Sequence, residues 1–198
     1  KVPFNKGKLK QSLLHSGANS ELADEIVSEV MEMLVEGMST RKIYKTAFRL
    51  LRNTSRPLAA RYNLKRAIME FGPSGFPFEQ FVGELLNQKG YRTQVGVIVK
   101  GHCVNHEVDV IAEKDNHHFM IECKFHNRQG YICDVKIPLY IQSRFLDVET
   151  SWKQIDGHSE KFHQGWVVTN TRFSEDAVQY GRCMNMNLVG WDYPKNNG

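Results

Sequence analysis

The sequence predicts an α+β protein of two domains, a small all-α bundle followed by an α/β domain with a central mixed sheet. Helical periodicity fills residues 6–71, and strand-like runs occur only after residue 90. Between them, the segment GPSGFP at residues 72–77 places two prolines and two glycines where no helix can continue. We therefore expect domains at residues 1–72 and 76–198.

Four helices are expected in the first domain. Their predicted starts are near Lys6, at Asn19 or Ser20, at Ser39 or Thr40, and at Ser55. Gly37 is the expected end of the second helix, because glycine favours the conformation that follows a helix. Met31, Met33 and Leu34 near this end form an apolar group that we expect in the core.

The second domain alternates helical and strand-like segments. The expected order is a helix at 78–90, strands at 91–101, 106–113 and 118–125, a helix at 134–149, a strand at 164–170, a helix at 174–185, and a strand at 188–191. This order is typical of a mixed sheet covered by helices.

The two strands of residues 106–125 are separated by a predicted tight turn at Asp115 and Asn116. That turn places Asp109 opposite Glu122, and Glu107 opposite Lys124. Opposed residues share a sheet face, with Cβ atoms about 5 Å apart. Two carboxylates at this distance repel each other unless a cation lies between them.

A carboxylate pair of this kind suits a hard divalent ion, Mg²⁺ or Mn²⁺, and Lys124 can orient or help deprotonate a metal-bound water. The matching reaction is phosphodiester hydrolysis. The opposite face is apolar and is expected to pack on helices: Val108, Val110, Ala112, Phe119, Ile121 and Cys123. The alternative is an ordinary two-sided antiparallel sheet, which shows the same division into charged and apolar faces.

Charge is unevenly distributed, although the net charge is only +4. Between Gly37 and Met69 every charged residue is basic: Arg41, Lys42, Lys45, Arg49, Arg52, Arg56, Arg61, Lys65 and Arg66. Such a run is either a solvated helical face or a surface for an anionic partner, a nucleotide or a nucleic acid backbone.

The cysteines and histidines raise the question of a zinc site. His102, Cys103, His106 and His126 are the candidate ligands, but the tight, repeated ligand spacing of structural zinc sites is missing. The four cysteines lack CxxC spacing and are expected to be reduced. No apolar run is long enough for a transmembrane helix, so we expect no membrane partner and a cytoplasmic location. The chain lacks an initiator Met and ends at YPKNNG, so both a whole protein and a fragment of a longer one stay open.

The segments FEQFVGELLNQKGY, HEVDVIA and IECKFH resemble the PD-(D/E)XK nuclease fold, and most closely its Mrr-type or type IV restriction endonuclease branch. The resemblance covers about residues 76–193. It implies metal-dependent DNA cleavage, with Asp109 and Glu122 as metal ligands, the Cys123 carbonyl as a further ligand, and Lys124 at the water. A glutamate on the first helix of such domains often joins the site, and here Glu79 matches that position with Glu84 in reserve.

The segments FNKGKLKQSLLHSGA, VEGMSTRKIYKTAF and LAARYNLKRAI resemble the ATP-cone, a helical module that senses ATP or dATP. The resemblance places Asn5, Lys8 and Thr40 near the nucleotide. The amino-terminal hairpin of that family is mostly missing here. No GxxxxGK[ST] loop occurs, so ATP hydrolysis is not expected.

These observations predict a Mg²⁺- or Mn²⁺-dependent DNA endonuclease, a homo-oligomer of type IV restriction character, whose helical domain responds to ATP or dATP or helps to hold DNA. The alternative is a non-catalytic nucleic-acid-binding or nucleotide-responsive regulator that retains a nuclease-like fold. A third interpretation, a nucleotide-gated repressor with a zinc ribbon, is disfavoured because paired cysteines are absent.

Overall fold

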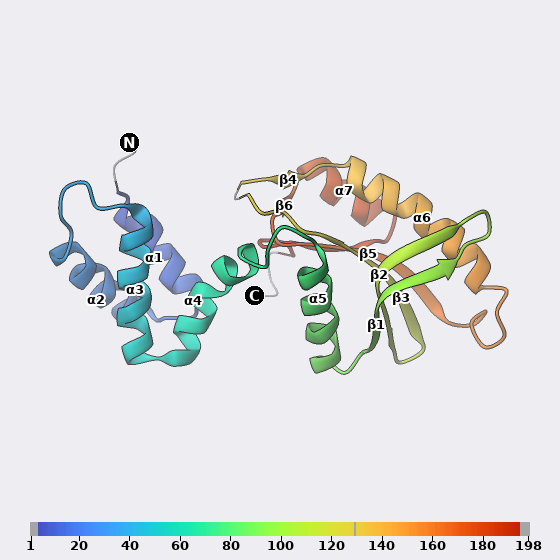
Figure 1. The fold of residues 1–198 in the computed structure, drawn as a ribbon, viewed down its shortest axis with the longest axis horizontal. Coiled ribbons are helices and arrows are strands. Elements are labelled where there is room, and N and C mark those ends of the chain that lie inside the picture. Colours follow the sequence, from blue (N-terminus) through green and yellow to red (C-terminus); the bar gives the residue numbers. More distant parts are fainter. Residues whose placement is uncertain (1–3, 129, 195–198) are drawn as a thin grey trace. The chain divides into compact units, whose positions relative to one another are not determined.

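The computed structural model describes residues 4–128 and 130–194, and its chain divides into two compact units, Lys1–Ala67 and Ile68–Gly198 (Figure 1). The first unit is helical, and the second contains a mixed sheet with helices on it. The predicted fold class is therefore confirmed. The division falls within helix α4 (Arg56–Met69), a few residues before the predicted Gly72–Pro77 boundary, because Ile68 already packs in the core of the second unit.

The first unit contains α1 (Lys6–His15), α2 (Ser20–Glu32), α3 (Thr40–Thr54) and most of α4. Polar side chains begin the first three helices by accepting a backbone hydrogen bond: Asn5 from Lys8 N, Asn19 from Leu22 N, and Ser39 from Lys42 N. Each bond satisfies an N–H group that a helix leaves unpaired at its first turn. The caps settle the alternatives left by the sequence, since Asn19 and Ser39 precede their helices.

Helix α2 ends at Glu32, five residues before the predicted end at Gly37. The predicted core position of two methionines near this end is wrong. Met31 and Met33 are each 43% exposed, and only Leu34 packs against the core of this unit. Met31 follows the buried Val30 by about 100° around the helix, which turns it away from the core.

The second unit begins with α5 (Phe76–Gln88), which precedes the strands of the sheet. The strands of the main sheet are β1 (Arg92–Lys100), β2 (Asn105–Lys114), β3 (His117–Lys124), β5 (Phe162–Thr169) and β7 (Asn187–Val189). They lie in the order β1-β2-β3-β5-β7; β1, β2 and β3 are antiparallel, whereas β5 and β7 run parallel to β3. This is the mixed sheet that the sequence predicts.

Two helices follow in the expected segments, α6 (Lys136–Trp152) and α7 (Glu175–Cys183). A second, two-stranded sheet pairs β4 (Ile132–Cys133) with β6 (Arg172–Phe173) and was not predicted, because strands of two residues leave no periodicity to detect.

Separate apolar cores cover the two faces of the main sheet. Phe78, Val82 and Leu86 of α5 pack with residues of β2 and β3 on one face, while Ile141 and Val148 of α6 pack on the other. Helix α5 approaches β1 so closely that a Cβ added to Gly83 would lie 2.7 Å from Val95 Cγ2. Among the described residues, no helix is both long and apolar enough to cross a membrane.

Candidate active site

The hairpin of β2 and β3 has the predicted turn and register. Asp115 and Asn116 adopt positive φ angles of 48° and 62°, as a two-residue hairpin turn with right-handed twist requires. Paired residues run from Lys114 and His117 at the turn to Val110 and Ile121. The backbone ladder therefore ends one pair before the predicted Asp109–Glu122 pair.

Asp109 explains where the ladder ends. Its Oδ2 accepts a hydrogen bond from the backbone N of Cys123 at 2.7 Å, so a side-chain oxygen binds the neighbouring strand. Opposite Asp109 on β1 stands Gly96, with φ 65°, between two regularly paired residues. Val108 packs in the α6 core, whereas Val110 packs in the α5 core, so the prediction that both share one face is wrong. The strand is distorted at Asp109.

Glu122 is a buried carboxylate held by two cations. It is 5% exposed; its Oε1 lies 2.6 Å from Lys124 Nζ, and its Oε2 lies 2.6 Å from Arg144 Nη1. Arg144 belongs to α6 and also donates to the backbone oxygen of Glu107. Lys124 therefore contacts Glu122, as the same-face spacing of the two residues predicts.

Arg144 is a site residue that the sequence interpretation missed. It stands beside Ile141 and Phe145, both buried on the same helix, and its own side chain is only 12% exposed. Its position in the sequence, within the apolar face of a predicted helix, could have identified it. A buried arginine is rarely found without a partner of opposite charge, so a carboxylate partner could have been expected.

The carboxylates of this region repel one another. Burial, then the negative charge of Glu122, raises the pKa of Asp109 to about 6, although the hydrogen bond from Cys123 N opposes the rise. Burial also raises the pKa of Glu79 on α5, followed by the charges of Glu122 and Glu107. Asp109, Glu122 and Glu79 therefore lie within electrostatic reach of one another, with Lys124 as a nearby cation.

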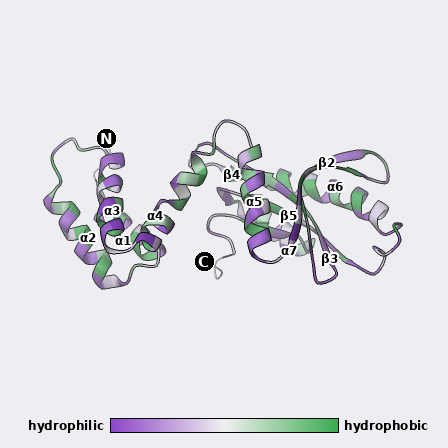
Figure 2. Cartoon of the chain, turned by 60° about the horizontal axis from the view of Figure 1, so that its bottom comes forward, coloured by the Kyte–Doolittle hydropathy of each residue, from purple (hydrophilic) through white to green (hydrophobic). Residues whose placement is uncertain are grey.

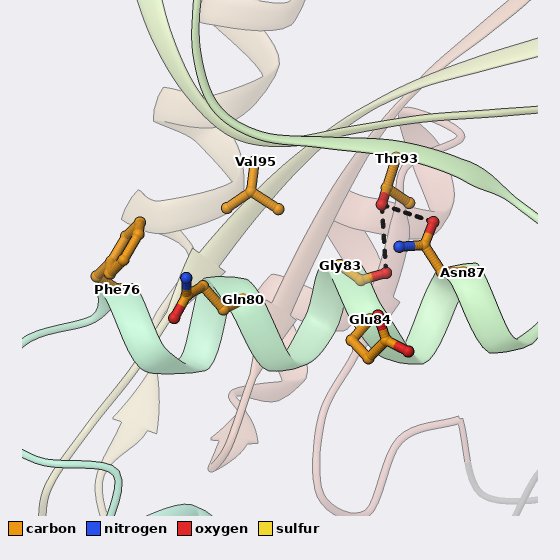
Figure 3. A pocket seen from close by; sticks show the side chains of 7 residues that line it. All are labelled: Phe76, Gln80, Gly83, Glu84, Asn87, Thr93 and Val95. Carbon is orange, nitrogen blue, oxygen red and sulfur yellow. Dashed lines mark hydrogen bonds between the residues drawn. The ribbon is translucent and has the colours of Figure 1, made fainter.

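Glu84, the reserve candidate on the same helix, lies elsewhere. It accepts a hydrogen bond from Gln88 Nε2 at 2.7 Å and lines a pocket of about 440 Å³ between α5 and β1 (Figure 3). Across this pocket Thr93 Oγ1 donates to Asn87 Oδ1 at 2.8 Å. The residues that line this pocket include one carboxylate and no cationic side chain, whereas several charged groups surround Glu122.

Cys123 is 6% exposed, and burial raises the pKa of its thiol well above the ordinary value. The thiol therefore stays protonated and is no nucleophile at neutral pH. Its backbone is the relevant part, because its N–H group holds Asp109.

A divalent metal ion fits this donor set. Asp109, Glu122 and Glu79 supply carboxylate oxygens, the ligands that Mg²⁺ and Mn²⁺ prefer. Burial first, and the charge of Glu122 second, raise the pKa of both Asp109 and Glu79, so their ionised forms are disfavoured where no cation binds them. A bound cation would relieve this repulsion.

The three residues predicted to bind a nucleotide are exposed to solvent in the first unit. The Asn5 side chain caps α1, and the side chains of Lys8 and Thr40 are exposed. Binding of ATP or dATP by these residues stays a prediction.

The four residues considered for zinc do not come together in the described part of the chain. His106 Nε2 lies 2.7 Å from Asp147 Oδ2, and Cys103 N donates to the other oxygen of the same carboxylate. His126 stacks on Tyr131, with ring centroids 3.9 Å apart. His102 N also donates to the backbone oxygen of Asp147, so three of the four residues contact Asp147, whereas His126 contacts Tyr131.

Comparison with known proteins supports a nuclease-like second unit. The restriction endonuclease family model Mrr_cat matches residues 73–136, which include Glu79, Asp109, Glu122 and Lys124. An uncharacterized protein of Archaeoglobus fulgidus is 44% identical over 117 residues, which cover 59% of this chain and 62% of that protein. The chain thus spans less than two thirds of this relative.

A crystal structure of a protein of unknown function, AF1548, is similar with a TM-score of 0.55 and 42% identity, covering 63% of this chain and 62% of that one. Residues 73–136 of the second unit therefore resemble a restriction endonuclease domain. The ATP-cone resemblance of the first unit receives no support from these matches.

Proposed function

We propose that the second unit hydrolyses phosphodiester bonds in DNA with the help of Mg²⁺ or Mn²⁺. The observation that carries this proposal is the crowding of Asp109, Glu122 and Glu79 beside Lys124, where the β2–β3 ladder ends. The match of this segment to a restriction endonuclease model supports the same chemistry.

Asp109 and Glu122 would hold the metal ion, with Glu79 and the carbonyl oxygen of Cys123 as further oxygen donors. When bound, such an ion polarises the phosphate and lowers the pKa of a coordinated water. The hydrogen bond from Cys123 N holds one oxygen of Asp109 and thereby orients its carboxylate.

Lys124 would act on the attacking water. Its ammonium already lies against Glu122 Oε1, so its position is set by an ion pair within the site. A cation there can orient the water and stabilise negative charge that develops on the phosphate oxygens. Arg144 would act as a positioning residue, because it binds Glu122 Oε2 and the Glu107 backbone from the side of α6.

The first unit would bind the phosphate backbone through α3. Five basic residues project within an arc of about 100° on this helix, as its period dictates: Arg41, Lys42, Lys45, Arg49 and Arg52. All five are exposed, and within the described parts of the chain none forms an ion pair (Figure 2 shows the hydrophilic residues of α3 in purple). Ile43, Ala47 and Leu51 are buried on the opposite side.

This basic face also suits the phosphates of ATP or dATP. A nucleotide bound there would regulate DNA cleavage, as in a type IV restriction endonuclease that responds to a nucleotide. DNA and nucleotide can be told apart by a gel-shift titration with and without ATP. A non-catalytic regulator is the second candidate, since Lys124 and Arg144 already partly neutralise Glu122 without a metal.

The test is cleavage of supercoiled plasmid by the purified chain with Mg²⁺, with Mn²⁺ and with a chelator. We expect metal-dependent nicking that Glu122→Gln abolishes and that Glu84→Gln, the matched change on the surface of α5, leaves intact. Equal nicking by wild type and Glu122→Gln would sink the proposal. Salt-dependent DNA binding without metal-dependent cleavage would favour the regulator.

A further inference from the structure

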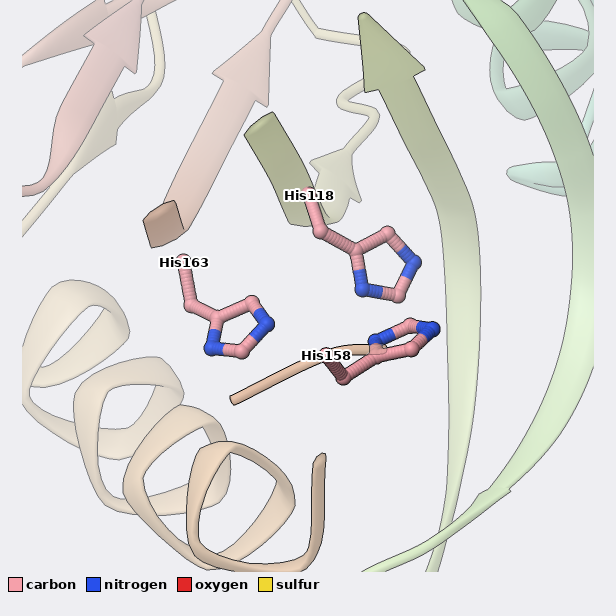
Figure 4. A group of neighbouring side chains, drawn as sticks. All are labelled: His118, His158 and His163. Atoms are coloured by element: carbon pink, nitrogen blue, oxygen red, sulfur yellow. The ribbon is translucent and has the colours of Figure 1, made fainter. Parts of the chain in front are cut away.

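Three histidines form a group at the opposite end of β3 from Glu122. His118 on β3 and His163 on β5 are partners in the parallel register, and His158 comes from the loop between α6 and β5 (Figure 4). One nitrogen from each ring lies within 4.8 Å of the other two. His118 and His163 are 6% and 7% exposed, so two of the three rings belong to the interior.

Several nitrogens of this group are buried without a hydrogen-bond partner. They are Nδ1 of His118, Nδ1 of His158, and both ring nitrogens of His163. A buried polar atom without a partner costs about 1–3 kcal/mol. Three adjacent rings with unused nitrogens are therefore unfavourable unless something binds them together.

The surroundings of His118 resemble those of a metal-binding histidine. Its Nε2 lies 3.6 Å from Glu113 Oε1, while Nδ1 is unpartnered and free to bind. This distance is too long for a hydrogen bond, but a small approach would let Nε2 donate to the carboxylate, as the second N–H group of a metal-ligating histidine usually does. Burial lowers the pKa of His118 to about 4 and also lowers the pKa of His163, which keeps both rings neutral at pH 7.

We propose that His118, His158 and His163 form a binding site for a divalent transition-metal ion, with Zn²⁺ as the best match. Imidazole nitrogens suit zinc, whereas Mg²⁺ prefers oxygen ligands. Nitrogens about 2.1 Å from a tetrahedral zinc ion lie about 3.4 Å apart, so the rings need only a small closing movement.

The fourth position of the ion has access to solvent. A surface pocket of about 240 Å³ reaches the group and is lined by Arg92, Gln94, Ile111, Glu113, His118 and His158. The buried Trp152 packs against His118, with ring centroids 4.0 Å apart. The ion would tie the loop of His158 to the sheet. It would lie about 13 Å along β3 from Glu122, so this site does not depend on the proposed cleavage.

The test uses the full chain, stripped with a chelator and titrated with Zn²⁺ by calorimetry, with Co²⁺ absorption as a spectroscopic readout. We expect this group to bind one equivalent of Zn²⁺, to give a visible Co²⁺ band typical of tetrahedral coordination, and to take up no Mg²⁺. His158→Ala and His163→Ala should each weaken Zn²⁺ binding by about 100-fold or more. The exposed His102→Ala is the matched control and should bind as the wild type does.

His158→Ala decides the question if His163→Ala fails to fold, because His158 lies in a loop. The proposal is overturned if the folded, stripped wild type takes up no Zn²⁺. It is also overturned if His158→Ala binds Zn²⁺ as tightly as the His102→Ala control.

Discussion

The two ends of β3 carry two different kinds of polar group on the same face of the sheet. At one end both oxygens of Glu122 are paired, by Lys124 and Arg144; at the other end His118 has a buried nitrogen without a partner. The acidic end is marked by residues two apart in one strand. The histidine end is assembled from two strands and a loop, so the spacing of residues along the chain could not predict it.

The largest expected effect concerns Lys124. Lys124→Ala should lower the metal-dependent cleavage rate by about 10²–10³-fold, the typical cost of removing one group that stabilises developing negative charge. Quantified plasmid nicking under single-turnover conditions measures this. Lys153→Ala removes an exposed lysine paired with Glu149 and should not change the rate. Equal cleavage rates for the two variants would show that Lys124 takes no part in cleavage.

Arg144→Gln should lower the free energy of unfolding by about 3 kcal/mol, because it leaves buried Glu122 with one cation fewer. Urea denaturation followed by circular dichroism measures the change. Arg172→Gln breaks the exposed pair with Asp192 and should cost less than about 1 kcal/mol. In the double variant with Glu122→Gln the losses should be less than additive; strict additivity would mean that the ion pair does not couple the two residues.

Stabilisation of the protein by Zn²⁺ should depend on the histidine end. At a free Zn²⁺ concentration about 100 times the dissociation constant, the free energy of unfolding of the wild type should rise by about 2.7 kcal/mol. Urea denaturation with Zn²⁺ or with a chelator measures the difference. The same rise in His158→Ala would show that the stabilising ion binds elsewhere.

The smallest effect is a pH dependence at Asp109. Its pKa is raised in the folded protein from 3.8 to about 6, so folding favours its protonated form. This contribution to stability is complete below about pH 4 and is lost as the pH rises through about 6. In chelator, the wild type should lose about 1 kcal/mol over this range, after allowance for partial exposure, relative to Asp109→Asn. Urea denaturation of both proteins across the range checks this, and parallel pH profiles would contradict it.

Local patterns predicted much of this molecule. The helix caps at Asn19 and Ser39, the turn at Asp115 and Asn116, and the mixed sheet all follow from residues close together in the chain. The exposure of Met31 and Met33 at the end of α2 was not predicted. An apolar side chain in the sequence is expected in the core, and only the packing of the helix shows that these two face solvent.

The candidate site divides in the same way. Glu122 and Lys124 are neighbours by strand period, so their contact could be expected from spacing alone. The placement of α5 could not be predicted from spacing; it brings Glu79 into the field of Glu122, whereas Glu84 lines a separate pocket. Arg144 reaches the site only because α6 packs across β3.

By itself the sequence determined the two-part α+β organisation, the acidic hairpin and the basic face of α3, because periodicity and turn chemistry act over a few residues. Only the tertiary structure decided that the β2–β3 ladder stops at Asp109, that Arg144 binds Glu122, and that three distant histidines meet. These features depend on which strands become neighbours and which helix covers them, and burial sets that arrangement over the whole domain.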